Sequence, residues 1–492
     1  MRLLNARTIE VEEFVEGNIP AYSILSHTWE KEEVSFQDME RQAHSAKAGY
    51  QKLLASCGQS LRDGFDYIWI DTCCIDKTSS AELSEAINSM YRFYEQAAVC
   101  YAFLSDVPDD TGFDEESSFA KSRWFTRGWT IQELLAPSRI VFYSKSWKPL
   151  GTKSELGRLI SSVSGIDEQF LGGRPLTYAS IAARMSWAAR RETTRAEDRA
   201  YSLLGVFGVN LPLLYGEGGN GAFIRLQEEL IRTSDDQSIF AWPCNGAYPG
   251  ASGNPYWLAS SPSDFLDCHD VVACHKIESP SYFFMGKTGI RMELPIFYHG
   301  SSSNNRAYGL LECRKAADYW NTLAVPVMIR GDRCFRQDGP MALFNRSAAF
   351  SRSFRVALNL ETRYGSPTHL MDPSEVPAMV VLKSLPPGYR ISNVVTSGQW
   401  TALSKTSGRL VQSWRPSMYS PDSSSTITIG SDGSTNTPCE MFCIIVTFPF
   451  LDSLLPSSQN INLLSGTLYF RIRTDECFQF DMDVLDVVFD DR

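Results

Sequence analysis

Two patterns of apolar and polar residues divide the chain at about residue 240. In the first part, short apolar runs alternate with segments whose apolar residues recur every three or four positions. That alternation is typical of strands joined by crossover helices in a mostly parallel sheet. The apolar runs predict strands over residues 22–28, 67–71, 99–104 and 139–143.

The segments between these runs predict helices. Apolar residues lie at helical spacing from Tyr50 to Leu61, and Ser79 with Glu82 forms a capping box ahead of a second apolar face. A short helix is expected over residues 123–135, where Pro137 ends it. Residues 154–231 have mainly helical periodicity.

After about residue 234, Ser, Pro and Gly become frequent and the apolar runs are of the β type. These runs cover residues 323–329, 354–358, 378–382, 442–448 and 466–472. We therefore expect an α/β domain with a helical extension over residues 1–240. A β-rich antiparallel domain, a sandwich or barrel of unknown role, should follow over residues 241–492. The Ser/Thr/Pro-rich segment 413–438 is expected to be a loop or a disordered insert.

The charge balance limits the classes of partner. With 46 basic and 57 acidic residues the net charge is −11, which disfavours binding of nucleic acid or an anionic membrane by the chain as a whole. A local basic face stays open. The N-terminus does not have the pattern of a secretory signal, and no apolar run reaches the roughly 18 residues of a membrane span. We expect a cytoplasmic protein.

The twelve cysteines predict no disulfide framework, because a long chain without a secretory signal should keep them reduced and buried. The pairs Cys268-His269 and Cys274-His275 suggest metal ligands at first sight. They lack the short spacing of zinc-binding cysteines, and no second ligand cluster follows. We expect no metal site.

Polar side chains follow the predicted strands at the points where the strands end. In an open parallel sheet, ligands bind in the crevice beyond the carboxyl ends of the strands. The residues at those ends are Ser26, His27, Thr28, Asp71, Cys73, Ser105 and Asp106. Strand ends are also polar simply because they meet water, so a functional and a structural interpretation of Ser26, His27 and Asp71 both stay open.

Five long segments, in order, resemble heterokaryon incompatibility (HET) domains of filamentous fungi. They are residues 22–39, 67–77, 81–107, 122–137 and 193–218. The resemblance implies a role in fungal non-self recognition, in which HET modules trigger growth arrest or cell death when incompatible hyphae fuse. Many members carry a nucleotide-binding switch domain and a repeat array after the module. This chain shows neither a G-x₄-G-K-[ST] loop nor a visible repeat.

HET domains are also distantly similar to TIR domains, which implies a TIR-like sheet with flanking helices. Residues 122–134 resemble the TIR helix that carries a Ser and then Trp-x₃-Glu-Leu. In enzymatic TIR domains that glutamate is needed to cleave NAD between nicotinamide and ribose. Carried over to this sequence, the resemblance implies that Glu133 is the catalytic residue. NAD is then a substrate, and no cofactor is expected.

The residue types agree with that chemistry. Trp129 and Glu133 are four positions apart and should share a helix face, where an indole could stack on a flat ring beside a carboxylate. Glu133 is also expected near the C-terminal end of its helix, where the helix dipole disfavours negative charge. The alternative is an ion pair of Glu133 with Arg127, Arg123 or Arg139, with Trp129 serving only the core.

Three other patterns are weaker. Cys73 or Cys74 with His27 could form a thiol nucleophile and its base, but adjacent cysteines after an apolar strand are more often packed than reactive. Five arginines could hold a phosphate, although the interleaved acidic residues favour an exposed salt-bridged helix. Those arginines are Arg184, Arg190, Arg191, Arg195 and Arg199. The glycines of residues 216–221 match G-x-G-x-x-G, which we interpret as a turn into a helix.

Two hypotheses of function follow. In the enzyme hypothesis the module self-associates and hydrolyses NAD with Glu133 as the catalytic group. The expected substrate-binding residues are Ser26, His27, Trp29, Asp71, Cys73, Arg127 and Trp129. In the scaffold hypothesis the same fold binds protein partners and consumes nothing. Both predict protein partners or self-association.

Overall fold

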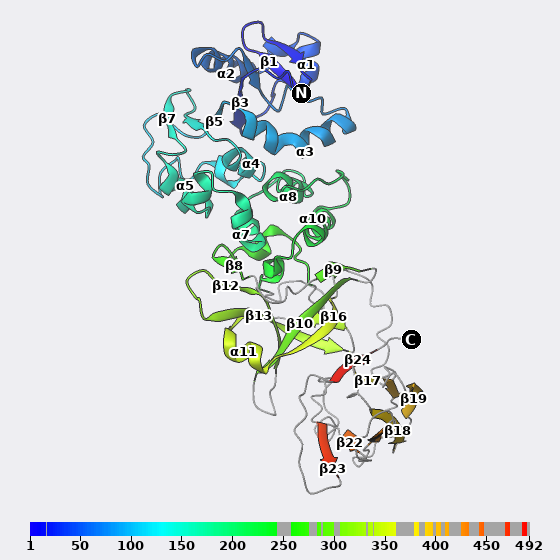
Figure 1. Cartoon of the computed structure of the whole chain (residues 1–492). Coiled ribbons are helices and arrows are strands. Elements are labelled where there is room, and N and C mark those ends of the chain that lie inside the picture. Colours follow the sequence, from blue (N-terminus) through cyan, green and yellow to red (C-terminus); the bar gives the residue numbers. More distant parts are fainter. Residues whose placement is uncertain are drawn as a thin grey trace.

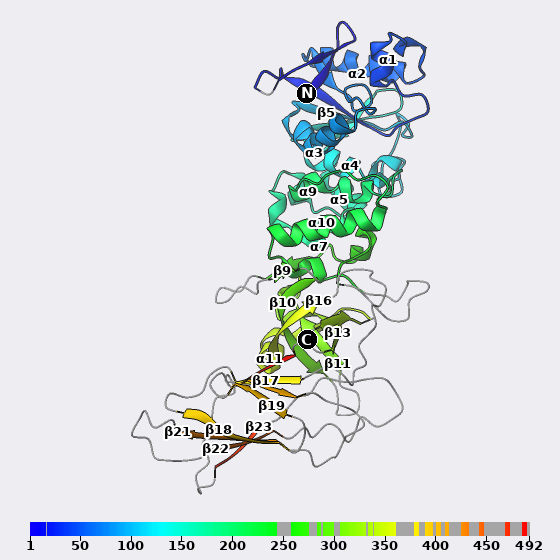
Figure 2. The ribbon, with the colours of Figure 1, turned by 90° about the vertical axis from the view of Figure 1, so that its right-hand side faces the viewer.

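The computed structural model describes residues 1–243 except residue 16, most of residues 257–360, and beyond residue 360 only short strands. Three layers follow one another along the molecule (Figure 1): an N-terminal sheet with its helices, a layer of helices, and a β-rich part. The turned view shows the same order, with the helical layer between the two β parts (Figure 2).

The N-terminal sheet has seven strands in the order β2-β1-β4-β3-β5-β6-β7. Its four central strands are parallel: β3 (Tyr22–His27), β4 (Tyr67–Trp69), β5 (Val99–Phe103) and β6 (Ile140–Tyr143). These are the four predicted strands, with ends shifted by at most two residues. Every residue of β3 and β5 is buried, which explains their continuous apolar character.

The three strands outside this parallel centre are antiparallel, and the sequence pattern did not predict them. They are β1 (Arg2–Asn5), β2 (Glu10–Glu13) and β7 (Pro149–Thr152). Three of the four residues of β2 are acidic, and β7 is PLGT, so neither strand has the apolar run that marks a buried strand. They form because the neighbouring strands offer free backbone groups at the sheet edges.

The strand order creates a switch point between β3 and β5. From β3 the chain passes through α1 (Phe36–Glu40) and α2 (Tyr50–Arg62) to β4 on one side. From β4 it passes through α3 (Ser80–Gln96) to β5, on the other side of β3. The two connections leave in opposite directions, and folds of this kind bind their ligands at such a switch point, beyond the carboxyl ends of the strands.

Alternate side chains of β3 face different helices, as the two-residue period of a strand requires. Ser23 donates a hydrogen bond to Ser60 of α2, 2.9 Å away. Tyr22 and Ser26 bond instead to residues of α3 and of α4 (Thr130–Leu135). The end of β3 therefore presents two separate polar groups, one on each face of the sheet.

The helix predicted over residues 123–135 is wrong as a single element. The structure has a 3₁₀ turn, η2 (Arg123–Thr126), and then α4, which begins at Thr130. The backbone of residues 126–128 does not continue the helix, because it forms hydrogen bonds with the backbone of Glu192 instead. Glu192 donates to the Thr126 carbonyl over 2.7 Å, and Gly128 donates to the Glu192 carbonyl over 2.8 Å. Because α4 has only six residues, Glu133 lies in its first turn and is also two residues before its C-terminal end.

The layer of helices lies between the sheet and the β-rich part. It contains α5 (Gly157–Ser164), α6 (Glu168–Leu171), α7 (Ile181–Ser186), α8 (Asp198–Tyr201), α9 (Leu204–Phe207) and α10 (Gly219–Thr233). Gln227 of α10 exchanges two hydrogen bonds with the backbone of Ala259 (2.8 and 2.9 Å). Ser180 donates to the carbonyl of Val271, 2.6 Å away. The layer is thus bonded directly to the β-rich part.

The β-rich part is largely antiparallel, as expected. Its main strands are β10 (Ile290–His299), β11 (Arg306–Leu310), β13 (Asn321–Arg330), β14 (Arg333–Arg336) and β16 (Phe354–Leu360). They follow the order β11-β10-β16-β14-β13, and β11 also pairs with β13, so the hydrogen-bonded circuit closes as in a barrel. The pair β14–β16 is parallel.

Two four-stranded antiparallel sheets follow, β19-β20-β17-β24 and β18-β21-β22-β23. The first sheet contains β17 (Ala378–Leu382), β19 (Trp400–Ser404), β20 (Arg409–Gln412) and β24 (Leu485–Phe489). The second contains β18 (Tyr389–Thr396), β21 (Ser425–Ser431), β22 (Phe442–Val446) and β23 (Leu468–Ile472). The segment 413–438, expected to be a loop or disordered insert, lies largely outside the described residues. The described piece of it is strand β21 (Ser425–Ser431).

Two further expectations concern membrane spans and the cysteines, and the described residues bear on both. Among them, no helix is both long and apolar enough to cross a bilayer. The eight cysteines in this part of the chain are free thiols, and seven of them are buried. Cys268 donates its thiol hydrogen to the Ala241 carbonyl (3.1 Å), and His275 lies outside the described residues.

Candidate functional site

A buried carboxylate lies beside the end of β3, at the switch point of the sheet. The Ser26 hydroxyl of β3 donates a short hydrogen bond to the Glu133 carboxylate of α4. Ser26 is fully buried, and Glu133 is 6% exposed. Of the two sequence interpretations of Glu133, the ion pair is not what the structure shows. Arg123, one of the three arginines considered, pairs with Glu30 instead.

Two aromatic side chains complete the surroundings of this carboxylate. Trp124 of η2 is fully buried and donates its indole N–H to the Ser26 hydroxyl, 2.7 Å away. Tyr94 of α3 is also buried; its hydroxyl donates to the Leu25 carbonyl (3.2 Å) and is near enough to Glu133 to influence its pKa. Since the indole N–H occupies the acceptor side of Ser26, the Ser26 hydrogen is directed to Glu133.

Burial controls the protonation of Glu133. It raises the pKa of Glu133 from 4.5 to about 7, and the negative charge of Asp71 acts in the same direction. The hydrogen bond from Ser26, the neighbouring Tyr94 hydroxyl and the charge of Arg127 lower that pKa and only partly oppose the rise. Glu133 is therefore a carboxyl group that gains or loses its proton near neutral pH.

His27 forms the second polar group, on the opposite face of β3. Lys52 of α2 donates to His27 Nδ1 (2.8 Å) and to Glu33 (2.5 Å), while His27 Nε2 lies 3.1 Å from Asp71 Oδ1. An ammonium only donates, so Nδ1 accepts and the Nε2 hydrogen points to Asp71. Burial lowers the pKa of Lys52, and the charge of Glu33 counters this.

Asp71 extends this chain of contacts to Trp29. The Trp29 indole N–H donates to Asp71 Oδ2 over 2.9 Å, and the Lys77 ammonium lies 3.7 Å from the same oxygen. Burial would raise the pKa of Asp71, but Lys77, His27 and Trp29 together hold it well below its usual range. Asp71 is therefore an anion that fixes the orientation of Trp29.

The rim beyond β5 carries a third set of contacts. Arg123 forms an ion pair with Glu30 and donates to the Ser105 hydroxyl, 2.9 Å away. Asp106 accepts from the Ser122 hydroxyl (2.8 Å) and from the Arg123 backbone (2.9 Å). The residues after β3, β4 and β5 thus gather at one edge of the sheet, as predicted, and η2 is tied to that edge.

Three of the expected substrate-binding residues, Cys73, Trp129 and Arg127, make contacts that the sequence did not predict. Cys73 is fully buried beneath the rim, and the neighbouring Cys74 together with burial raises the pKa of its thiol well above the usual range. This is not the environment of a reactive thiolate. The Trp129 indole donates to Asp198 of α8 (3.3 Å), so it faces the helical layer rather than Glu133. Arg127 contributes its carbonyl to Arg191 (2.8 Å).

The expected exposed, salt-bridged helix of arginines is also wrong. Arg184 lies in α7 and Arg199 in α8, with a non-helical segment between them. Arg191 is 8% exposed and binds the carbonyls of Trp187 (3.2 Å) and Arg127 (2.8 Å) and the Thr130 hydroxyl (2.8 Å). Arg191 therefore supports the start of α4, which carries Glu133.

The glycine motif is a turn into a helix, as interpreted, because α10 begins directly after Gly218. Glu197 Oε1 accepts the backbone N–H groups of Gly216 (2.9 Å) and Gly218 (3.2 Å). An internal carboxylate thus occupies the amides that a phosphate would need.

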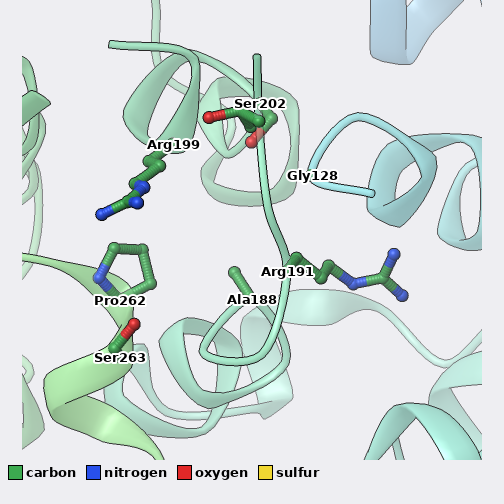
Figure 3. Close-up of a pocket in the computed structure, with 8 residues that line it drawn as sticks. Gly128, Ala188, Arg191, Arg199, Ser202, Pro262 and Ser263 are labelled. Atoms are coloured by element: carbon green, nitrogen blue, oxygen red, sulfur yellow. The ribbon is translucent and has the colours of Figure 1, made fainter. Parts of the chain in front are cut away.

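Two of the cavities in the described part are small. One, between α8, the segment that precedes it and the 3₁₀ turn η5 (Pro262–Phe265), has a volume of about 10 Å³, room for about one water molecule. In Figure 3, Arg199 borders it beside Pro262, whereas the Arg191 guanidinium points away from both. The second, of similar volume, is lined by His27, Lys52 and Glu33 among others.

Sequence reasoning missed Trp124, Tyr94, Lys52 and Lys77. Trp124 and Tyr94 lie in segments with an apolar pattern, and a buried aromatic that also donates a hydrogen bond looks in sequence like any core residue. Lys52 interrupts the apolar face of α2 one position before Leu53, and that interruption was the available signal.

Comparisons with known proteins identify the class. A family model described as heterokaryon incompatibility protein (HET) matches residues 22–119, which contain β3, β4 and β5. The chain therefore contains a segment that matches the heterokaryon incompatibility (HET) domain, as the resemblance of its motifs implied. Over 221 residues, 44% of this chain, it is 48% identical to the vegetative incompatibility protein HET-E-1 of Podospora anserina. The match covers 16% of that relative's length.

A second family model, described as a domain of unknown function (DUF8212), matches residues 221–298. This match runs from within α10 into β10, across the boundary that we predicted at residue 240. No solved structure was found to match the chain.

Proposed function

We propose that this chain is an effector of vegetative incompatibility, part of the innate immunity of a filamentous fungus, and that its HET module triggers programmed cell death from the cytoplasm. The support is the HET family match and the similarity to HET-E-1, whose name assigns it to vegetative incompatibility. Recognition then uses the β-rich part or a separate protein partner, and the module acts after self-association.

We further propose that the module is TIR-like and hydrolyses NAD⁺ between nicotinamide and ribose, with Glu133 as the catalytic carboxylate. The observation that carries this proposal is the position of Glu133: a buried carboxylate, bonded to Ser26, at the switch point where a doubly wound sheet binds its ligands. Its pKa near 7 is the second support, because perturbed carboxyl groups in such crevices are typical of active sites.

The proposed reaction breaks the bond between C1′ of the ribose and the nicotinamide nitrogen. The bonding electron pair goes to that nitrogen, so nicotinamide leaves neutral and needs no proton. Ionised Glu133 stabilises the positive charge that develops on the ribose. Water then adds to C1′ and releases one proton, which gives ADP-ribose. Access requires Ser26 and Glu133 to be uncovered, and we assign that opening to assembly of modules.

The test is nicotinamide release from NAD⁺ by the purified full-length chain, concentrated to favour assembly. Glu133→Gln should abolish release while the chain stays folded. The matched control is Glu229→Gln, the same change at a surface residue that pairs with Arg232 and lies outside the site. Equal release from the wild type and Glu133→Gln would eliminate Glu133 as the catalytic group.

One observation favours the scaffold as a second candidate. Glu133 lines neither of the two small cavities described above, and a buried Ser26–Glu133 pair can serve stability alone. A scaffold predicts that overexpression stays toxic in Glu133→Gln, and that no assembly condition yields nicotinamide. Loss of toxicity in a folded Glu133→Gln chain would argue against it.

A further inference from the structure

Trp29 is an exposed aromatic side chain held in one orientation. It lies two residues beyond β3, is 43% exposed, and is not part of the buried core. Its indole N–H is bonded to Asp71, and Asp71 is bonded through His27 to Lys52 of α2. An indole fixed in this way loses little conformational freedom when a ligand ring stacks on it.

A cation already lies on this ring. The Lys77 ammonium is 3.6 Å from the centroid of the Trp29 ring, whereas the other cation–ring distances in the described part run from 3.9 to 5.7 Å. Those other contacts are made by arginines, whose planar groups can also stack. An ammonium cannot stack, and its attraction to the ring is that of a positive charge for the π-face.

The surroundings strengthen that preference for positive charge. Asp71 is anionic and accepts the indole hydrogen, which makes the ring richer in electrons. Asp71 also raises the pKa of Glu133, so the two carboxyl groups are close enough to interact. Trp29 therefore lies in a field that favours a cationic ring over a neutral ring of the same shape.

We propose that Trp29 is the ring-binding platform of this site and selects a planar cationic ring, which takes the place now held by the Lys77 ammonium. The nicotinamide ring of NAD⁺ is such a cation, and the dihydronicotinamide of NADH is neutral. The ligand's identity rests on the proposed function; the platform and its charge selectivity are additional to it. In the absence of a ligand, the Lys77 ammonium occupies the place of the cationic ring. Its flexible side chain is 31% exposed and can move away when the ligand binds.

The test uses the full-length wild-type chain and two ring compounds that cannot be hydrolysed at a glycosidic bond. One is 1-methylnicotinamide, a permanent pyridinium cation, and the other is neutral nicotinamide. Isothermal titration calorimetry should show the cation binding about tenfold more tightly than the neutral ring. Equal affinities, or no binding of either compound, would overturn the proposal.

Single substitutions test whether Trp29 causes the preference for the cationic ring. Trp29→Leu should remove it, whereas Trp320→Leu, which alters another exposed tryptophan (76% exposed) in the β-rich part, should leave it unchanged. Lys77→Gln should tighten binding of 1-methylnicotinamide, because it removes the competing ammonium. A preference that survives Trp29→Leu, or weaker binding by Lys77→Gln, would contradict the assignment.

The outcomes separate the platform from the proposed catalysis. Glu133→Gln should keep most of the preference for the cation while it loses nicotinamide release, because Trp29 and Asp71 are unchanged. Selective binding by a wild-type chain that releases no nicotinamide would overturn the NAD⁺ hydrolase and leave the platform standing. Release of nicotinamide without selective binding would do the reverse.

Discussion

The Ser26 hydroxyl donates a hydrogen bond to the Glu133 carboxylate, although the two residues are 107 positions apart in the chain. Ser26 is the last residue but one of a buried parallel strand, and Glu133 lies in a short helix whose first residue, Thr130, accepts a hydrogen bond from Arg191. This contact makes the buried carboxylate a part of the sheet edge where ligands of such folds bind.

The protonation of Glu133 should make stability depend on pH. Its pKa in the folded chain, about 7, lies above the ordinary 4.5, so the folded state holds the proton across this window. The contribution of this proton to the free energy of unfolding is fully present below pH 4.5 and is lost as the pH rises through 7. The free energy of unfolding should fall by about 3 kcal/mol at most over that range. Glu133→Gln has no such loss. Its free energy of unfolding relative to the wild type should therefore rise between about pH 5 and 8 in denaturant titrations.

Nicotinamide release should have the opposite dependence on pH, because only the ionised carboxylate stabilises positive charge on the ribose. We expect the single-turnover rate to rise as the pH passes through about 7 and then to level off. The rate at saturating NAD⁺ across that range is the measurement. A rate that falls through neutrality would mean that the protonated form of Glu133 is the active one.

Ser26→Ala should be more harmful than Ser23→Ala, although both serines are fully buried on β3. The first change removes a donor to a carboxylate and leaves the Trp124 N–H without its acceptor, a cost of about 3 kcal/mol. The second breaks a bond between two neutral hydroxyls, worth about 1 kcal/mol. Thermal unfolding of the two variants measures both losses of stability. Equal losses would mean that the bond to Glu133 contributes no more to stability than the bond between the two hydroxyls.

Gly205→Ala should destabilise the contact between the helical layer and the sheet. A Cβ at Gly205 of α9 would lie 2.2 Å from Tyr91 Cβ and 2.5 Å from Gln132 Oε1. These overlaps should cost about 3 kcal/mol. Gly58→Ala in α2 is the control, since its nearest neighbour is the flexible end of Arg62 at 3.6 Å, and it should gain about 0.5 to 1 kcal/mol. Urea titration measures both; a neutral Gly205→Ala would show that α9 can shift.

Glu197 should be required as an acceptor for the loop before α10. Glu197→Ala leaves the amides of Gly216 and Gly218 without their partner, and we expect a loss of about 2 kcal/mol. Glu197→Gln keeps one oxygen for both amides and should lose about half as much. Limited proteolysis of the loop and the melting temperature report the effect, and identical behaviour of the two variants would mean that the charge alone matters.

The sequence predicted correctly those strands whose burial requires a continuous run of apolar residues. Strands β3 and β5 are buried along their whole length, and such strands need continuous apolar residues whatever the rest of the chain does. Strand β2, with the sequence EVEE, carries no such requirement, because a sheet edge accepts polar residues on its open face. Its pairing with β1 depends on the sheet that is already there.

The end of the predicted helix 123–135 shows the limit for local patterns. Its residues suit a helix, but the backbone of residues 126–128 gains hydrogen bonds with Glu192, a partner 64 positions from Gly128. That competition moved the start of the helix to Thr130, so Glu133 lies in the first turn of a helix of only six residues. It also sent Trp129 toward Asp198 and away from the carboxylate.

The sequence alone determined the α/β class of the first part and the polar character of Ser26, His27 and Asp71 at its strand ends, because apolar periodicity needs only local information. The HET family followed from the resemblance of five segments to that family. The tertiary structure decided what each polar group does: Glu133 bonds to Ser26 instead of an arginine, Cys73 is buried, and Trp29 is held by Asp71. Those contacts join segments that are distant in the chain, and the burial that shifts the pKa of Glu133 exists only once the sheet, η2 and α4 have packed together.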